Sequence, residues 1–458
     1  MSALSIDTQP PSGVDIHALR MRLEGDLIVP GDPRWDESRR AWNLAVDQRP
    51  FAVALVESAD DVVAVVDFAR VHGLRVAPQG TGHGASAIES LEDTILVKTE
   101  RMRRVEIDAA ARRVRVEAGA IWADVVEPAA AHGFVVLHGS SPDVGVVGYS
   151  LGGGMGWLAR SHGLSANSVT AVELVTADGR RVRADRENEP DLLWAVRGGG
   201  GNFGVVTAVE LVLYDAPELY AGVLFFPVER ASEVLHAWCE WVETVPDHVT
   251  SVGRIMHFPP LPMVPEPMRG SSFALVEAVV AGPESEGAEL IQPLRELGPV
   301  MDTFAAVPPT ALQHLHMDPP EPVPGAGDGM FLDALPPEAV DAVVANGGRP
   351  LLSLEIRQLG GKLAEPSAAN GAVGSINASF VMFAVGITPT PESAAAVDAA
   401  VDRAQAALEP WESPRTYFNF AERPVSAERL YPAETYRRLR RIRDAYDPGR
   451  LFVANHRI

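Results

Sequence analysis

The chain of 458 residues has a single cysteine, Cys239, and only two lysines, Lys98 and Lys362. One thiol excludes an intrachain disulfide and a zinc site built on cysteines. No run approaches the roughly 20 apolar residues of a membrane-spanning helix, and the first residues lack the basic and apolar regions of a signal peptide. These absences predict a soluble, cytoplasmic protein.

Positive charge is also scarce, since 39 basic residues face 61 acidic ones and the formal net charge is −22. Such a surface repels nucleic acid and anionic membranes, so we expect neither as a partner. The hydrophobic content of 47% and the charged content of 22% are ordinary for a globular protein. The length predicts two or three domains with sizeable cores.

Glycine, in contrast, is concentrated in loops. The segment 78–86, Pro-Gln-Gly-Thr-Gly-His-Gly-Ala-Ser, follows an apolar run at 73–77 that is predicted to be a strand. Its alternating glycines expose backbone amides, which can converge on an anion such as a phosphate. His83 is the one imidazole in this loop, so a bound ligand is expected to contact it. The simpler alternative is a turn in which His83 makes only a local hydrogen bond.

The same loop also fits the dinucleotide fingerprint G-x-G-x-x-A through Gly80, Gly82 and Ala85. That motif requires a long helix directly after the loop, to receive a pyrophosphate. Residues 95–98 read instead as another strand, which argues against a nicotinamide-binding Rossmann domain.

Two more glycine clusters follow, at 145–156 and 197–204. A run such as 145–156 is not expected to form a regular element by propensity alone. Three bare loops predict one extended ligand enclosed by the chain, with tight packing between chain segments as the alternative.

The remaining pattern predicts an α+β protein. A β-α-β unit is expected over 51–77, with a helix that starts near Ser58 and ends at Gly73. Strands are predicted at 95–98, 105–108, 113–117, 134–137 and 205–213, a helix at 118–132, and a hairpin over 169–183 through Asp178-Gly179. After residue 215 we expect helices at 234–245, 393–408 and 433–446, strands at 351–356 and 379–385, and proline-rich loops at 258–267 and 318–329.

These motifs, in this order and spacing, resemble those of the berberine bridge enzyme-like flavin oxidoreductases, within the vanillyl-alcohol oxidase and p-cresol methylhydroxylase superfamily. The resemblance spans nearly the whole chain. It rests on the Gly-His-Gly loop at 80–84, the glycine run at 144–156, His162-Gly163-Leu164 with Asn167, 176–179, 191–204, Tyr417-x-Asn419, and Tyr446-Asp447-Pro448 with Asn455.

The resemblance implies an α+β fold in two parts. An FAD-binding domain of the p-cresol methylhydroxylase type would take residues 1–215, with its core at 48–215, and would be completed by the C-terminal segment 413–458. A substrate-binding domain, with an antiparallel sheet backed by helices, would take residues 216–412.

The resemblance further implies bound FAD, attached covalently through His83 at the flavin 8-methyl group. Many relatives add a second bond from a cysteine, but Ser141 occupies that position and cannot form a thioether. Cys239 lies in a predicted amphipathic helix and is interpreted as a packing residue. Val144 falls where relatives control oxygen access and favours oxidase behaviour, although a core contact is an equal alternative. The expected FAD-binding residues are Gly80, Thr81, Gly82, His83, Gly84, Ser141, Val144, Gly145, Gly148, Gly152, Gly153, Gly154, Asn167, Gly204, Val205, Val206, Asn419 and Asn455.

For catalysis, such enzymes transfer a hydride to flavin N5 while a base removes a hydroxyl proton. Tyr417 is the first candidate base, and its neighbours must lower a pKa that is ordinarily near 10. Gln358 is its expected partner. On a strand Gln358 points opposite to Glu355 and Arg357, so a flavin-facing Gln358 would leave those two as a structural ion pair. The alternative is a structural role, in which Tyr417 is buried and its hydroxyl only makes a hydrogen bond.

The sequence thus predicts an FAD-dependent oxidoreductase, most simply an oxidase that acts on an alcohol or similar C–H bond of a small metabolite, with O₂ as a possible partner. A flavin-binding protein without turnover and a nicotinamide dehydrogenase that uses the loop at 80–85 are the alternatives. His314 and His316 invite a metal site, but no nearby carboxylate or cysteine completes a ligand set, so no metal is expected. Substrate identity and oligomeric state are not encoded in any recognisable motif.

Overall fold

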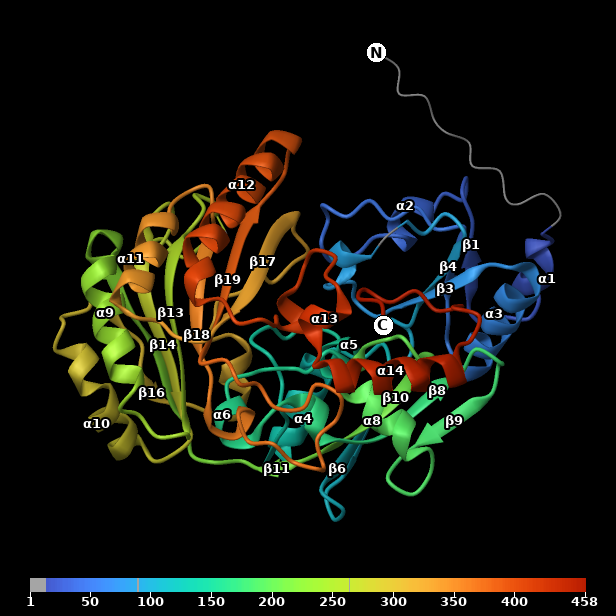
Figure 1. Cartoon of the computed structure of the whole chain (residues 1–458), viewed down its shortest axis with the longest axis horizontal. Helices are drawn as coiled ribbons and strands as arrows, with labels where there is room; N and C mark the ends of the chain where they lie inside the picture. The colour runs from blue at the N-terminus through green and yellow to red at the C-terminus, as the bar shows by residue number, and fades with distance from the viewer. Residues whose placement is uncertain (1–13, 89, 263) are drawn as a thin grey trace.

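The computed structural model describes residues 14–458 except residues 89 and 263. The start of the chain, from which we predicted the absence of a signal peptide, lies outside these residues. Figure 1 shows a large sheet with helices on its outer face at one end of the molecule and two smaller sheets at the other end. This mixture of sheets and helices confirms the predicted α+β class.

The first small sheet has the order β1-β2-β4-β3 and is formed by Asp26–Ile28, Ala52–Leu55, Thr94–Lys98 and Arg75–Gln79. Strands β2, β4 and β3 run parallel, and α3, Ala59–His72, makes the crossover. The Ser58 hydroxyl caps α3 by accepting from the amide of Asp61, and Gly73 ends it with a left-handed φ of 69°. The predicted β-α-β unit is therefore confirmed, and β3 leads directly into the loop that contains His83.

The second small sheet is antiparallel, with the order β5-β6-β10-β8-β9. Its strands are Val105–Asp108, Arg113–Glu117, Val205–Val212, Val169–Val175 and Arg181–Ala184. The hairpin through Asp178-Gly179 is confirmed, with Gly179 at a φ of 80°. The predicted strand at 134–137 is shorter, because only β7, Phe134–Val135, pairs with β11, Tyr214–Asp215.

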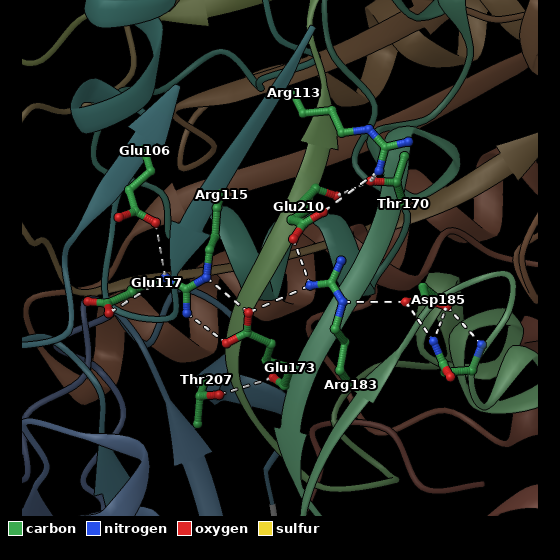
Figure 2. Close-up of polar contacts among 11 residues, drawn as sticks. Glu106, Arg113, Arg115, Glu117, Thr170, Glu173, Arg183, Asp185, Thr207 and Glu210 are labelled. Carbon is green, nitrogen blue, oxygen red and sulfur yellow. Dashed lines mark hydrogen bonds and ion pairs between the residues drawn. The ribbon is translucent and has the colours of Figure 1, made fainter. Parts of the chain in front are cut away.

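One face of this second sheet is polar. Figure 2 shows arginine and glutamate side chains that reach across neighbouring strands. Arg115 Nη2 lies 2.6 Å from Glu173 Oε2, and Arg183 Nη1 lies 2.6 Å from Glu210 Oε1. The alternate residues of β6, with Val114 and Val116 fully buried, pack into the core below. The alternation of apolar and charged residues thus sets which face of the sheet meets α4 (Ala123–Ala131) and α8 (Pro190–Gly199).

The C-terminal segment joins this N-terminal half. The Val453 amide donates to the Val76 carbonyl at 2.8 Å, and the buried Asp447 carboxylate accepts from the amides of Leu451 and Phe452. Helix α14, Ala433–Tyr446, contacts α8. The start and the end of the described chain therefore build one body around β3.

The large sheet has the order β15-β12-β14-β13-β18-β19-β17, with β16 also paired to β12, and its neighbouring strands run antiparallel. The strands are Met301–Asp302, Tyr220–Pro227, Ser272–Val280, Val249–His257, Ser353–Gln358, Phe380–Ile387, Gly325–Leu332 and, for β16, Ala305–Ala306. Helices α9 to α12 cover its outer face (Figure 1) and span Ala231–Val242, Glu284–Arg295, Pro337–Asn346 and Pro391–Leu408. The sheet backed by helices is as predicted, while the exact domain boundaries stay a prediction.

Two local predictions were wrong. The glycine run at 145–156 contains a helix, α5, Val146–Leu151, because Val146, Val147 and Leu151 are buried in the core beneath it. The proline-rich segment 318–329 is not all loop, since β17 begins at Gly325 and pairs with β19.

The remaining elements are short connections. They are α1 (Ile16–Arg20), α2 (Trp35–Ser38), α6 (Ala159–His162), α7 (Ser165–Ser168), α13 (Ala427–Leu430) and the 3-10 turns η1 to η6 at Ala85–Ala87, Val228–Arg230, Pro309–Gln313, Gly361–Leu363, Glu409–Trp411 and Phe418–Phe420. Within the described residues no helix is both long and apolar enough to cross a bilayer.

Candidate active site

The loop after β3 presents unused amide donors. Among the described residues, no acceptor is bonded to the backbone N–H groups from Thr81 to Gly84. Gly82 has a φ of 87°, and a Cβ there would lie 2.9 Å from Cα of Ala41, so this position requires glycine. Backbone amides without acceptors are available to an anion, which is consistent with the use that we predicted for this loop.

His83 is held on three sides within this loop. Its ring stacks on Trp42, with centroids 4.4 Å apart and planes inclined by 21°. Its Nδ1 lies 2.6 Å from Thr81 Oγ1, and its Nε2 is buried without a hydrogen-bond partner, 3.7 Å from Asp143 Oδ1. The imidazole is thus fixed in orientation, with one nitrogen directed at a carboxylate.

Asp143 accepts hydrogen bonds from Trp42 Nε1 and from Ser141 Oγ, the latter at 2.6 Å. Burial alone would raise the pKa of its carboxyl group, but His83 and Ser141 outweigh burial and lower that pKa. Neither Trp42 nor Asp143 was among the residues predicted from the sequence to have a function. Nothing in the local sequence of Trp42 signals a function, because its contact with the loop exists only in the fold.

The second glycine cluster faces the first. Helix α5 begins after Gly145, and the amides of Val147 and Gly148 have no acceptor in the described part of the chain. A Cβ on Gly145 would lie 3.6 Å from the Thr81 side chain, whereas Gly148 borders open space. Val144 packs against the neighbouring core, and its carbonyl accepts from Trp122 at 3.0 Å. Two loops with free amides therefore lie side by side.

Tyr417 lies at the far end of α5. Its side chain is buried, and its hydroxyl oxygen accepts hydrogen bonds from the amides of Gly154 and Met155 and from Asn419 Nδ2 at 3.4 Å. Asn419 Nδ2 also donates to the Tyr149 carbonyl at 3.0 Å. The Tyr-x-Asn motif is thus anchored to the glycine run.

The pKa of Tyr417 is raised above its ordinary value, because burial outweighs the lowering by the two amides, Asn419 and Arg357. The expectation that neighbours lower this pKa is therefore not met by the chain alone. The three donors nevertheless point at the oxygen where a phenolate charge would develop, so they oppose the cost of forming it.

Gln358 does not accompany Tyr417, and this prediction was wrong. Its Nε2 donates to the Val242 carbonyl at the end of α9, at 2.9 Å. The side chains of Leu354 and Ile356 pack on the same helix-covered face, and strand alternation places Gln358 with them.

Arg357 faces the opposite side of the sheet, toward Tyr417. Its guanidinium carbon lies 5.1 Å from the ring centroid of Phe420, and that ring contacts Tyr417 edge-on at 5.2 Å. The pair that we expected to face away is the pair that borders the site.

A buried ionic cluster extends from Arg357. His316 Nδ1 lies 2.5 Å from Glu277 Oε2, and His316 Nε2 lies 2.7 Å from Glu355 Oε2. Arg357 Nε donates to Glu355 Oε1 at 2.6 Å, while Arg254 Nε lies 3.0 Å from Glu277 Oε1 in a geometry too bent for a hydrogen bond. We call these five residues, Arg254, Glu277, His316, Glu355 and Arg357, the ionic cluster.

The residues of the ionic cluster shift one another's pKa values. Burial and Arg254 oppose a charge on His316, but Glu277 and Glu355 outweigh them and raise the pKa of the imidazole to about 9. Burial would raise the pKa of Glu355, but Arg357, His316 and Arg254 hold it far below its ordinary value. A carboxylate held this firmly ionised is a weak base, so the cluster forms a fixed polar wall beside the site.

The other sequence candidates have structural roles. His316 belongs to the ionic cluster and His314 is exposed, and the described residues contain no group of three or more potential ligands that could hold a metal ion. Cys239 donates to the Leu335 carbonyl, and burial raises the pKa of its thiol to about 11.

The remaining residues that we predicted to bind the cofactor lie in several different environments. The Asn167 side-chain oxygen accepts from the Gly371 amide at 3.0 Å, and the side chains of Val205 and Val206 are buried in two different cores. Gly204 borders the Val175 carbonyl in the neighbouring strand. Asn455 lies beside the first loop, with Nδ2 3.2 Å from where a Cβ of Gly84 would be. A Cβ on Gly152 would clash with Asn419, and a Cβ on Gly153 would have little room beside Tyr417. Gly154 lies against Tyr149 and Ser165.

The residues present fit FAD. Free amides on two adjoining loops suit its pyrophosphate. Buried polar atoms without partners lie in or beside the two glycine clusters, namely both side-chain atoms of Gln79, Nε2 of His83 and Oη of Tyr149. Buried polar groups are normally hydrogen-bonded, so these atoms indicate a polar ligand.

Glu422 links the first loop to the large sheet. Its carboxylate accepts from Ser86 Oγ at 3.5 Å, and its amide donates to Asp328 Oδ1 at 3.1 Å. Burial and then Asp328 raise the pKa of the Glu422 carboxyl group to about 7. The folded chain therefore holds this proton more tightly than the unfolded chain does.

Glu422→Gln is expected to stabilise the protein at high pH. Native stability from the protonated carboxyl is present below the ordinary pKa of 4.5 and is lost as the pH rises through about 7. The glutamine variant avoids this loss, so its advantage in free energy of unfolding grows by about 1–3 kcal/mol between pH 5 and pH 8. Urea unfolding at both pH values measures it. The exposed Glu289→Gln is the control, and an advantage that does not change with pH contradicts the assignment.

Comparison with known proteins supports this picture. Residues 50–185 match a sequence-family model described as "FAD binding domain". The (R)-6-hydroxynicotine oxidase of Paenarthrobacter nicotinovorans is 28% identical over 463 residues, which cover 96% of this chain and 98% of that protein. The glucooligosaccharide oxidase of Sarocladium strictum is 32% identical over 188 residues, covering 40% of this chain and 38% of its own.

Solved structures are similar over the whole length. The crystal structure of 6-hydroxy-D-nicotine oxidase from Arthrobacter nicotinovorans has a TM-score of 0.80 at 25% identity and covers 94% of this chain and 96% of its own. A berberine bridge enzyme-like protein of Physcomitrella patens has a TM-score of 0.84 at 17% identity, covers 96% and 98%, and shows the fold alone. The predicted fold, with its FAD-binding part and its sheet-based second part, is confirmed.

Proposed function

This chain belongs to the berberine bridge enzyme-like FAD-linked oxidoreductases of the vanillyl-alcohol oxidase and p-cresol methylhydroxylase family, and on that premise we propose that it is an oxidase of a small metabolite. Bound FAD would supply the redox chemistry, as the acceptor of a hydride from the substrate. The proposed donor is an alcohol or similar C–H bond, and the proposed acceptor of the electrons is dioxygen.

One arrangement carries this proposal. The free amides of the two loops lie at one end of α5, beside His83, and the Tyr417 hydroxyl lies at the other end, beside Arg357 of the large sheet. A cofactor bound by these amides would have its ring system between His83 and Tyr417. A substrate between that ring and the polar wall would then be within reach of one hydroxyl able to handle a proton.

We further propose that His83 carries the flavin. Its Nε2 is buried and unpartnered, so a bond to the flavin leaves no hydrogen bond unmade. A ring already fixed against the cofactor also has a high effective concentration toward it. Ser141 donates to Asp143 and lacks a thiol, so a single covalent bond is expected.

The proposal is tested on the purified protein. We expect a yellow protein with a flavin absorbance spectrum and about one FAD per chain, most of which stays with the polypeptide after acid precipitation. Anaerobic mixing with a substrate bleaches this spectrum, and air restores it. Because similar proteins are named as oxidases of 6-hydroxynicotine and of oligosaccharides, the screen includes cyclic amines, oligosaccharides and simple secondary alcohols.

Each alternative gives a different result. A colourless protein that cannot take up FAD overturns the proposal. Reduction by a nicotinamide cofactor without any flavin spectrum would point to the dehydrogenase alternative. Flavin that no donor class bleaches indicates a binding protein without turnover.

A further inference from the structure

We propose that a cavity beside Arg357 binds a carboxylate of the substrate, so that the electron donor is an alcohol that also carries an acid group. The inference rests on the proposed function, because the cavity adjoins the place where the flavin and Tyr417 would meet the substrate. It narrows the open class of small metabolites to hydroxy acids.

The cavity lies between the end of the glycine run and the inner face of the large sheet, which is the face opposite helices α9 to α12. It encloses about 350 Å³ of empty space, part of it open to solvent, and its lining includes Met155, Arg160, Thr250 and Arg357. The amide of Met155 donates to the Tyr417 hydroxyl, so the cavity begins next to the candidate base. Groups of a substrate that lie beyond the reacting carbon are therefore close to this cavity.

The charged side chains that line the cavity are both arginines. Arg160 and Arg357 contribute guanidinium groups, and no aspartate or glutamate is among the described residues that line it. Arg160 uses its donors on the chain itself, since Nε donates to the Val249 carbonyl at 2.6 Å and Nη1 donates to the Leu359 carbonyl. Its acidic neighbour Asp247, 3.2 Å away, is 69% exposed, so water weakens that ion pair. Arg160 thus brings positive charge to the cavity.

Arg357 brings a free donor as well as charge. Its Nε donates to Glu355 Oε1 at 2.6 Å and its Nη2 lies 3.1 Å from His316 Nε2, whereas its Nη1 has no acceptor among the described residues. The guanidinium carbon lies 5.1 Å from the ring centroid of Phe420, which holds the group in place. An unused N–H on a fixed cation is suited to a ligand that accepts a charged hydrogen bond.

Two buried donors accompany Arg357. Thr250 and Trp157 also line the cavity, and Thr250 Oγ1 and Trp157 Nε1 are buried without a partner in the described part of the chain. Strand alternation places Thr250 on the inner face with Val252, which belongs to the same apolar cluster as Trp157. An indole N–H and a guanidinium can only donate, so the ligand group must accept. A carboxylate has two acceptor oxygens and a negative charge, which match these donors.

The alternative is that water fills the cavity. The ionic cluster and the nearby Asp318 together hold three positive and three negative charges, so net charge alone does not require an anion. Water would then satisfy Thr250 and Trp157, and the cavity would bind carboxylates no better than neutral amides. The carboxylate site predicts a clear preference, because hydrogen bonds to a charged group are stronger than neutral ones.

The first test measures ligand binding to the purified flavoprotein without turnover. Benzoate and its neutral isostere benzamide are titrated separately, and the change in flavin absorbance gives the Kd of each. In wild type we expect benzoate to bind about tenfold or more tightly than benzamide. Equal Kd values for the two ligands overturn the inference.

Variants that each remove one donor locate the site. Arg357→Met is expected to raise the Kd of benzoate by about tenfold or more, and Thr250→Val and Trp157→Phe by about threefold to tenfold, with the Kd of benzamide changed by less than about threefold. Thr170→Val and Arg113→Met, on the polar face of the second small sheet (Figure 2), are the matched controls. If Arg357→Met takes up no FAD, the other two variants decide, and unchanged benzoate binding in both of them overturns the inference.

The second test measures anaerobic flavin reduction by hydroxy acids, each compared with its methyl ester, in a series with increasing distance between hydroxyl and carboxylate. We expect at least one acid to have a Kd about tenfold or more below that of its ester. The limiting rates should be similar, because the carboxylate lies away from the reacting carbon. Esters that match their acids throughout the series contradict the inference.

The outcomes also distinguish this inference from the proposed function. A flavin that neutral alcohols bleach, in a protein without preference for benzoate, overturns the carboxylate site and leaves the oxidase proposal standing. A preference for benzoate in a protein whose flavin no donor bleaches supports the site and overturns the oxidase. A protein that takes up no FAD overturns both.

Discussion

Tyr417→Phe is expected to lower kcat by about 10²–10⁴-fold, the range typical of a lost general acid or base. The variant removes the one hydroxyl that two amides and Asn419 surround at the end of α5. In wild type, kcat is expected to rise with pH through the neutral range, because the pKa of the buried phenol lies above its ordinary value and only the ionised form accepts a proton. Stopped-flow reduction of the flavin under anaerobic conditions measures the chemical step directly.

The controls for this variant are its flavin content and its stability. Loss of the phenol oxygen leaves the amides of Gly154 and Met155 without their acceptor, which costs about 1–3 kcal/mol for each buried donor. FAD content close to wild type shows that the site is still assembled. If flavin reduction in Tyr417→Phe keeps both the wild-type rate and its pH dependence, Tyr417 is not the base.

His316→Gln is expected to lower the free energy of unfolding by about 3–5 kcal/mol, as for other broken buried ion pairs. The imidazole separates two buried carboxylates, Glu277 and Glu355, at 2.5 Å and 2.7 Å. Without its positive charge, both anions keep their desolvation cost and lose their shared partner. Urea unfolding, followed by tryptophan fluorescence, measures the change.

The double variant His316→Gln with Glu277→Gln should recover part of this loss, because it removes one of the two buried anions. His314→Gln is the matched control, since the side chain of His314 is exposed. An equal loss of unfolding free energy in His316→Gln and His314→Gln would show that the ionic cluster has no special role.

The pH dependence gives an independent check on His316. The pKa of the folded imidazole is raised from 6.5 to about 9, so the stability it provides is fully present below pH 6.5. That stability is lost as the pH rises through about 9. Wild type should therefore weaken between pH 7 and pH 9, and His316→Gln should show a flatter profile in this window.

The N-terminal half was predictable because its signals are local. Alternating valines in β6, the cap at Ser58 and the stop at Gly73 each act within a few residues. The positive φ of Gly82 and the unused amides after it likewise follow from the residue types in the loop. Sequence reasoning therefore located the loop and His83 correctly within the fold.

The site beyond the loop was less predictable, because its contacts join distant segments. The orientation of Gln358 could have been inferred from the apolar neighbours Leu354 and Ile356, which share its face and must meet the helices. The ionic cluster draws on β13, β14, β18 and the segment after η3. No local sequence pattern indicates that these four segments meet in the fold.

Helix α5, Val146–Leu151, shows that intrinsic helix propensity does not decide the local structure by itself. Glycine disfavours helix, yet burial of Val146, Val147 and Leu151 outweighs that preference.

The contact of the C-terminal segment with β3 has a consequence for biosynthesis. Residues from Asp447 to Val453, which are translated long after β3, complete the sheet edge from which the earliest glycine loop departs. A nascent polypeptide emerges in order, so the first half must wait, with this edge unpaired, while the rest is translated. The loop that contains His83 therefore reaches its final support only after the segment 447–453 has been made.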